Sequence, residues 1–71
     1  MTEPGLHRGV VASFDDDAGF GTVLDDDGTE LFFHCTAIAD GSRTIAGDTP
    51  VTFVVVPGRL GRWEAAGVAP R

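Results

Sequence analysis

Two phenylalanines and a histidine stand together in the short segment Glu30–Cys35, which reads ELFFHC. Aromatic rings can stack on other flat ring systems, and an imidazole can also donate a hydrogen bond. Successive side chains of a strand point to opposite faces, so Leu31 and Phe33 point one way while Phe32 and His34 point the other. If the first pair faces a core, the second presents a ring and an imidazole to solvent. This arrangement favours a binding surface.

The same residues do not predict catalysis. His34 and Cys35 are adjacent, but on a strand they point to opposite faces, and no third group is indicated that would orient a base. One cysteine and two distant histidines fall short of a structural zinc set. The aspartate runs lack the loop spacing of a calcium-binding EF-hand. We therefore expect no enzyme activity, no metal site and no cofactor.

The length and composition predict one small folded domain. The 71 residues, 42% of them hydrophobic, have room for a single core, so we expect one domain over residues 1–71. No apolar run approaches the roughly 20 residues that span a bilayer. The start MTEPGLHRG has no apolar signal-peptide region, and Cys35 as the only cysteine fits a reducing compartment. We expect a cytoplasmic protein without membrane contact.

The charge argues against a simple nucleic-acid binder. Eleven acids and five arginines, without lysine, give a formal net charge of −6, whereas phosphate contacts usually require a basic surface. Six of the acids lie in two runs, Asp15–Asp17 and Asp25–Asp27, between apolar segments. Such runs are typical of solvated turns, so we interpret both in this way.

Five short segments have the alternation or β-branched content of strands, and none has helical periodicity. In the first, either set of alternating side chains can face the core, because Gly9 is compatible with a bulge. Asp27-Gly28 is a strong hairpin signal. The connection over 35–48 has no sustained period, and we place a short 3₁₀ turn near Thr36–Ala39. Five short strands favour a small closed barrel. The predicted strands are 8–14, 20–24, 30–34, 51–56 and 62–68.

The ordered set of motifs resembles the bacterial cold-shock domain family over residues 9–68. It comprises GVV at the first strand, GFG at Gly19–Gly21, the Asp27-Gly28 turn, FFH followed by TAI within Phe32–Ile38, and EAAGV near the end. The resemblance implies an all-β fold, a five-stranded antiparallel OB-fold barrel. The family binds single-stranded RNA or DNA on the outer face of its first three strands.

The resemblance also implies which residues bind. Phe20, Phe32 and His34 match family positions that stack on bases, a contact that tolerates any sequence because every base has a π-face. Phe33 is interpreted as a core residue. The further candidates for nucleic-acid binding are Phe14, Arg43, Arg59, Arg62 and Trp63.

Several departures from the family pattern weaken this surface. The family usually has lysine and tryptophan where this chain has Ala12 and Ser13, and aromatic rings where it has Thr22 and Cys35; a lysine is also replaced at Ala18. At roughly 1–3 kcal/mol of stacking per base, the loss of three rings removes at least about 3 kcal/mol, or about two decades of affinity. We expect a weak, low-specificity, RNA-chaperone-like protein.

Two alternatives remain open. Trp63, after Arg62, either stacks on a base at the surface or plugs the end of the barrel. The whole barrel is either a nucleic-acid binder or an interaction module whose binding face has been redirected to a protein partner. The net charge of −6 favours the second.

Overall fold

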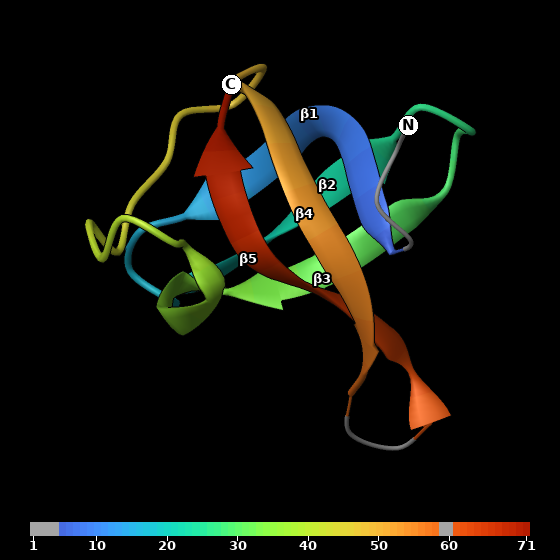
Figure 1. Cartoon of the computed structure of the whole chain (residues 1–71). Helices are drawn as coiled ribbons and strands as arrows, with labels where there is room; N and C mark the ends of the chain where they lie inside the picture. The colour runs from blue at the N-terminus through green and yellow to red at the C-terminus, as the bar shows by residue number, and fades with distance from the viewer. Residues whose placement is uncertain (1–4, 59–60) are drawn as a thin grey trace.

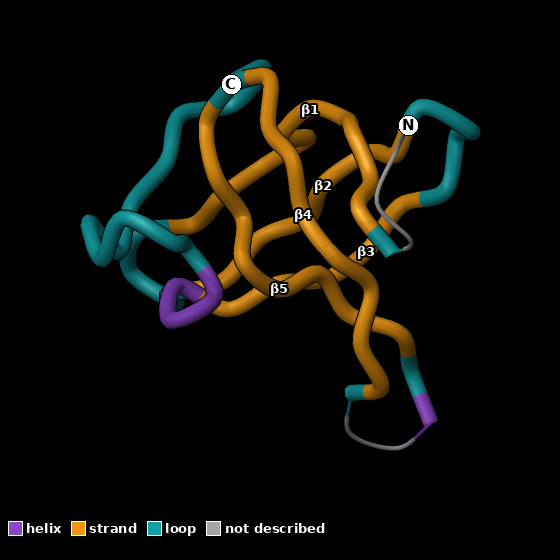
Figure 2. Tube along the Cα trace, in the orientation of Figure 1, coloured by secondary structure: helices purple, strands orange, loops and turns teal. Residues whose placement is uncertain are grey.

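In the part of the chain that the structure describes, the named elements are five strands and one short 3₁₀ helix. Figures 1 and 2 show how they are arranged. The computed structural model describes residues 5–58 and 61–71. Each strand overlaps its prediction within two residues at either end, and the 3₁₀ turn lies slightly earlier than predicted, over Cys35–Ala37. The elements are β1 Leu6–Asp15, β2 Phe20–Asp25, β3 Glu30–His34, η1 Cys35–Ala37, β4 Pro50–Pro57 and β5 Trp63–Pro70.

The strands close into a barrel in the order β1-β2-β3-β5-β4, with β4 returning to β1. This confirms the predicted all-β barrel. Four neighbouring pairs are antiparallel, but β3 and β5 run parallel, with Phe32 opposite Glu64. The expectation of a wholly antiparallel barrel is wrong at this pair. Five is an odd number, so strand direction cannot alternate all the way around a closed ring.

The core is filled by the inward side chains of all five strands and of Ile38. Leu31 and Phe33 are buried while their neighbours Phe32 and His34 are not, which confirms the alternation predicted for β3. Each fully buried aliphatic or aromatic side chain contributes roughly 1.5–3 kcal/mol relative to an exposed one. The buried residues are Val11, Val23, Leu31, Phe33, Ile38, Val51, Phe53, Ala65 and Val68.

A bulge in β1 changes which side chains face the core. The pairing with β2 shifts between Val11 and Ser13, which leaves Ala12 without a partner. Ala12 and Ser13 are consequently both exposed, and Phe14 is turned back towards the core. At Gly9, where we considered a bulge, the pairing with β2 is regular.

Gly9 and Gly21 instead mark places where β1 and β2 approach too closely for a side chain. A Cβ at Gly9 would overlap the carbonyl oxygen of Leu24, and one at Gly21 would overlap that of Ser13. The two glycines therefore hold β2 firmly against β1. This packing positions β2 and, through it, the outer face of β3.

Candidate nucleic-acid interface

Three ring side chains predicted from the sequence lie together on the outer face of β2 and β3. Phe20, at the start of β2, is directly opposite His34, at the end of β3. Phe32 lies between them, with its ring centroid 5.2 Å from that of Phe20 and 4.9 Å from that of His34. The ring of Phe32 is tilted against Phe20 and meets His34 edge-on. We call Phe20, Phe32 and His34 the ring patch.

The ring patch is accessible to a ligand. Phe20 is 42% exposed, His34 is exposed, and Phe32 is half-buried between them. The exposure of apolar ring surface to water is unfavourable, and contact with another apolar surface lowers the free energy. The patch can therefore stack on flat, partly apolar ligands.

A row of polar groups crosses the same face beside the rings. Ser13 Oγ lies 3.3 Å from Thr22 Oγ1, and Thr22 Oγ1 donates to Glu30 Oε2 at 3.0 Å. Thr22 is directly opposite Phe32, so this row borders the ring patch. It places hydroxyl groups where the cold-shock resemblance calls for aromatic rings.

Glu30 also belongs to this face, although it was not among the binding residues predicted from the sequence. Glu30 is exposed and precedes Phe32 by two positions on the same strand. The two-residue period of a strand puts both side chains on one face, so the signal was present. A carboxylate here repels phosphate but accepts hydrogen bonds from ligand N–H groups.

The acidic turn after β1 lies at the border of the patch. Asp15 is directly opposite Phe20, and its Oδ1 accepts hydrogen bonds from the backbone N–H groups of Asp17 at 3.0 Å and Ala18 at 3.1 Å. Asp16 accepts a hydrogen bond from Thr44 of the long connection. The turn is exposed, as predicted, and it brings negative charge next to the rings.

Phe14 lies apart from the ring patch. It is half-buried and packed against the core, and its ring stacks on that of Phe33 at 5.6 Å between centroids. The bulge at Ala12 is the cause, since it reverses the alternation of β1 before Phe14. A binding role for Phe14 stays a prediction.

The other candidates come from segments other than β2 and β3, and their binding roles stay predictions. Arg43 is exposed in the connection between η1 and β4, and Arg62 is exposed just before β5. Trp63 is 61% exposed, which answers the question left open: it lies at the surface and does not plug the barrel. The β4–β5 hairpin that carries it extends beyond the other strands (Figure 1). Arg59 lies outside the described residues.

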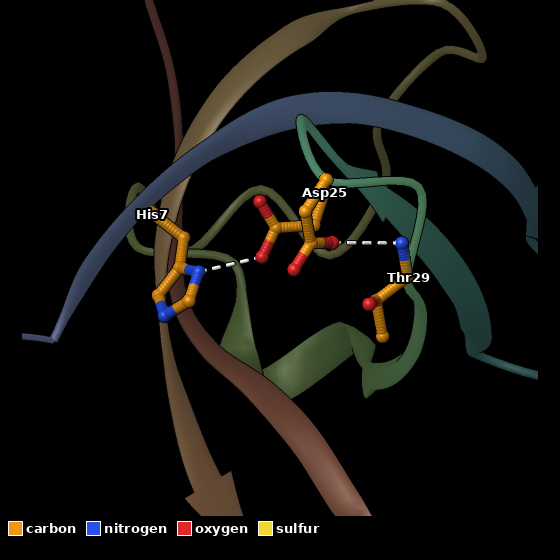
Figure 3. A network of polar contacts seen from close by, with 4 residues as sticks. His7, Asp25 and Thr29 are labelled. Atoms are coloured by element: carbon orange, nitrogen blue, oxygen red, sulfur yellow. Dashed lines mark hydrogen bonds and ion pairs between the residues drawn. The ribbon is translucent and has the colours of Figure 1, made fainter.

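Trp63 instead lines a pocket at the end of the barrel near the β2–β3 turn. The pocket has a volume of about 340 Å³, and we call it the His7 pocket. His7 Nδ1 lies 2.5 Å from Asp25 Oδ2 (Figure 3), and the His7 ring stacks on Phe53 at 5.5 Å between centroids. The residues lining it are His7, Asp25, Asp27, Thr29, Leu31, Val55 and Trp63.

The position of Asp25 corrects one expectation. Both aspartate runs were interpreted as solvated turns, but Asp25 is only 9% exposed and ends β2. Its partner His7 is far away in the sequence, on β1. A buried carboxylate requires such a partner, and no local pattern identifies one 18 residues away.

Within residues 5–58 and 61–71, no group of three or more His, Cys, Asp or Glu side chains could hold a metal ion. Cys35 is a free, half-buried thiol in η1. None of the helices described is long and apolar enough to cross a membrane.

Comparison with known proteins agrees with this geometry. A family model described as 'Cold-shock' DNA-binding domain matches residues 7–70. The chain is 36% identical over 67 residues to Cold shock protein 2 of Lactiplantibacillus plantarum, an alignment that covers 93% of this chain and 100% of that protein. It is 34% identical over 64 residues to Cold shock protein CspB of Bacillus caldolyticus, covering 89% of this chain and 96% of that protein.

A solved structure shares the fold. The chain superposes on drosophila Unr CSD456 with a TM-score of 0.77 and 30% sequence identity. The match covers 93% of this chain but 26% of the other chain.

Proposed function

The chain belongs to the cold-shock domain family, and on that premise we propose that it binds single-stranded RNA or DNA, weakly and with little sequence preference, on the outer face of β1 to β3. Binding of this kind would hold RNA in an unpaired form, the action of an RNA chaperone in the cytoplasm. The description of the matching family model, 'Cold-shock' DNA-binding domain, supports nucleic acid as the ligand class.

The observation that carries the proposal is the ring patch. Phe20, Phe32 and His34 form a continuous row of rings with centroid spacings of 5.2 and 4.9 Å. Unpaired bases stack on such a row without hydrogen-bond readout, so little sequence preference results. His34 adds a nitrogen that can hydrogen-bond a base edge or a phosphate oxygen.

The surroundings of the patch explain why binding should be weak. The polar row Ser13, Thr22 and Glu30 occupies the part of the face where further aromatic rings would strengthen nucleic-acid binding. Asp15 adds a second carboxylate at the border of the ring patch. Both carboxylates oppose the approach of phosphate groups. Few arginines are available to offset them.

A titration with oligo-dT, followed by amide chemical shifts, tests the proposal. We expect shifts at Phe20, Phe32 and His34, and a loss of roughly 1–3 kcal/mol of binding free energy in Phe32→Ala, because one base loses its stacking partner. Val54→Ala is the matched control, since Val54 is an exposed apolar residue without a ring on β4, a strand outside the proposed face. Absence of binding at high micromolar concentration, or equal losses in both variants, would contradict the proposal.

A second candidate is a protein-interaction module with the same barrel. Glu30 favours this second candidate. The hydrogen bond from Thr22 holds its carboxylate on the proposed binding face, where the negative charge opposes phosphate. Salt dependence separates the two functions. A single-stranded nucleic-acid complex loses roughly 0.7 log unit of affinity per phosphate contact for each decade of salt. A partner protein recovered without RNA, and bound with little salt dependence, would favour the module.

A further inference from the structure

The His7 pocket lies away from the ring patch and is not used by the proposed function. Thr29, which lines the pocket, comes just before β3, whereas His34, which belongs to the ring patch, is the last residue of β3. The pocket forms where the start of β1, the β2–β3 turn, the end of β4 and the start of β5 come together. A ligand in the pocket and a base on the ring patch would therefore occupy opposite ends of β3.

Two of the residues lining the pocket are apolar and belong to the core or pack against it. Leu31 is 6% exposed and belongs to the core, and Val55 packs against that core. His7 is held on two sides, by the stack on Phe53 and by the contact of its Nδ1 with Asp25 (Figure 3). The pocket is thus already formed before any ligand enters, which keeps the entropic cost of binding low.

Asp27 supplies the accessible charge. Asp25 is buried and already paired with His7, whereas Asp27 is exposed. The Thr29 backbone N–H donates to Asp27 Oδ1 at 2.9 Å. That bond, with a further one from the Thr29 side chain and the nearby His7, holds the pKa of Asp27 below its usual value. The carboxylate therefore stays ionised at neutral pH.

Trp63 supplies a wall suited to a cation. Its indole is the largest side chain in the pocket lining and is 61% exposed. The face of an indole attracts cations more strongly than that of any other side chain. An exposed indole beside an ionised carboxylate is a combination that recognises a flat cation.

We propose that the His7 pocket binds the guanidinium group of an arginine side chain presented by a partner protein. The planar guanidinium stacks on Trp63 while its N–H groups donate to the carboxylate of Asp27. The methylene stem lies over Leu31 and Val55, which are apolar. Lysine fits less well, because its ammonium is compact and strongly hydrated.

Charge argues against a nucleotide as the occupant. The acidic run Asp25–Asp27 lines or borders the pocket, so the phosphate of a nucleotide would be repelled. The net charge of −6 acts in the same direction and attracts a basic partner. A protein segment that carries an arginine is complementary to the negative charge at the pocket and to the negative net charge of the whole protein.

The test compares two capped pentapeptides, Gly-Ser-Arg-Gly-Ser and the same peptide with neutral citrulline in place of arginine. Binding is followed by the amide shift of Thr29 and the indole N–H shift of Trp63. We expect both signals to move with the arginine peptide, and an affinity at least about tenfold higher than for citrulline, because citrulline keeps the shape and loses the charge. Equal affinities would overturn the proposal.

Two single-charge variants separate the pocket from the general charge of the protein. Asp27→Asn should weaken the arginine peptide about tenfold, while asparagine still accepts the Thr29 N–H. Asp17→Asn makes the same charge change in the exposed β1–β2 turn, and we expect less than about a twofold effect there because of screening. Equal effects of the two variants would mean diffuse attraction and would overturn the proposal.

A nucleotide is the competing occupant. If guanosine monophosphate shifts Thr29 and displaces the arginine peptide, the pocket is a nucleobase site and the proposal is wrong. These outcomes are independent of oligo-dT binding, which is read at Phe32 on the ring patch. Either proposal can therefore fail while the other stands.

Discussion

Phe32 and Phe33 are adjacent in the chain and have opposite environments. Phe33 is fully buried and stacks on Phe14, whereas Phe32 lies between Phe20 and His34 on the outer face. The strand period alone separates them. At the scale of single residues, one phenylalanine is therefore part of the core, and the other is the one that we propose to bind nucleic acid.

Stability measurements should show this division. We expect Phe33→Leu to lower the free energy of unfolding by roughly 1–3 kcal/mol, because a cavity opens in the core and the stack on Phe14 is lost. Phe32→Ala should cost less, since Phe32 is only half-buried. Urea unfolding followed by far-UV circular dichroism measures both. A larger loss in Phe32→Ala than in Phe33→Leu would contradict the assignment.

At the scale of elements, the contact between β1 and β2 determines where the outer face lies. Gly21 is the residue opposite Phe14, and a Cβ there would overlap the carbonyl oxygen of Ser13 and approach Phe14 Cα within 2.8 Å. Backbone atoms cannot move aside as a flexible side chain can. The pairing of β1 with β2, and the position of Phe20 at its end, depend on a glycine at this point.

Gly21→Ala is accordingly expected to destabilise the protein by roughly 3 kcal/mol or more, because the two strands must separate to make room. Gly47→Ala is the matched control: a Cβ at Gly47 meets nothing within 4 Å, so we expect a change of less than about 1 kcal/mol. Thermal unfolding of the two variants makes the comparison. Similar midpoints for both would show that β1 and β2 are not packed as described.

At the scale of the whole molecule, a net charge of −6 surrounds a surface proposed to bind a polyanion. The exposed turn at Asp16 and Asp17 follows Asp15, which is opposite Phe20, whereas Asp26 is in the turn after β2. At about 0.1 M salt, the electrostatic interaction between exposed charges is largely screened beyond about 10 Å. The acidic residues near the ring patch should therefore lower the affinity for nucleic acid more than those at the β2–β3 turn.

Removing one nearby charge should strengthen nucleic-acid binding. We expect Asp17→Asn to raise the affinity for oligo-dT roughly two- to fivefold at about 0.1 M salt, and the gain to shrink as salt rises. Asp26→Asn, with the same charge change in the turn after β2, should have a smaller effect. Fluorescence or amide-shift titrations provide the affinities. A gain that persists at high salt would argue against an electrostatic cause.

Much of this arrangement could be predicted from local sequence patterns. The five strands, the turn at Asp27-Gly28, and the outward placement of Phe32 and His34 follow from alternation and turn chemistry over a few residues. Glu30 could have been found in the same way. The position of Phe14 could not, because the bulge at Ala12 leaves no clear mark in the sequence.

The sequence by itself determined the strands, their turns and the shared face of Phe32 and His34, because those features arise from neighbouring residues. Only the tertiary structure decided that Asp25 is buried against His7 and that Trp63 lies exposed beside them. The tertiary structure also decided that β3 pairs in parallel with β5. The physical reason is that these features depend on which distant strands meet when the barrel closes, and local patterns do not specify that register.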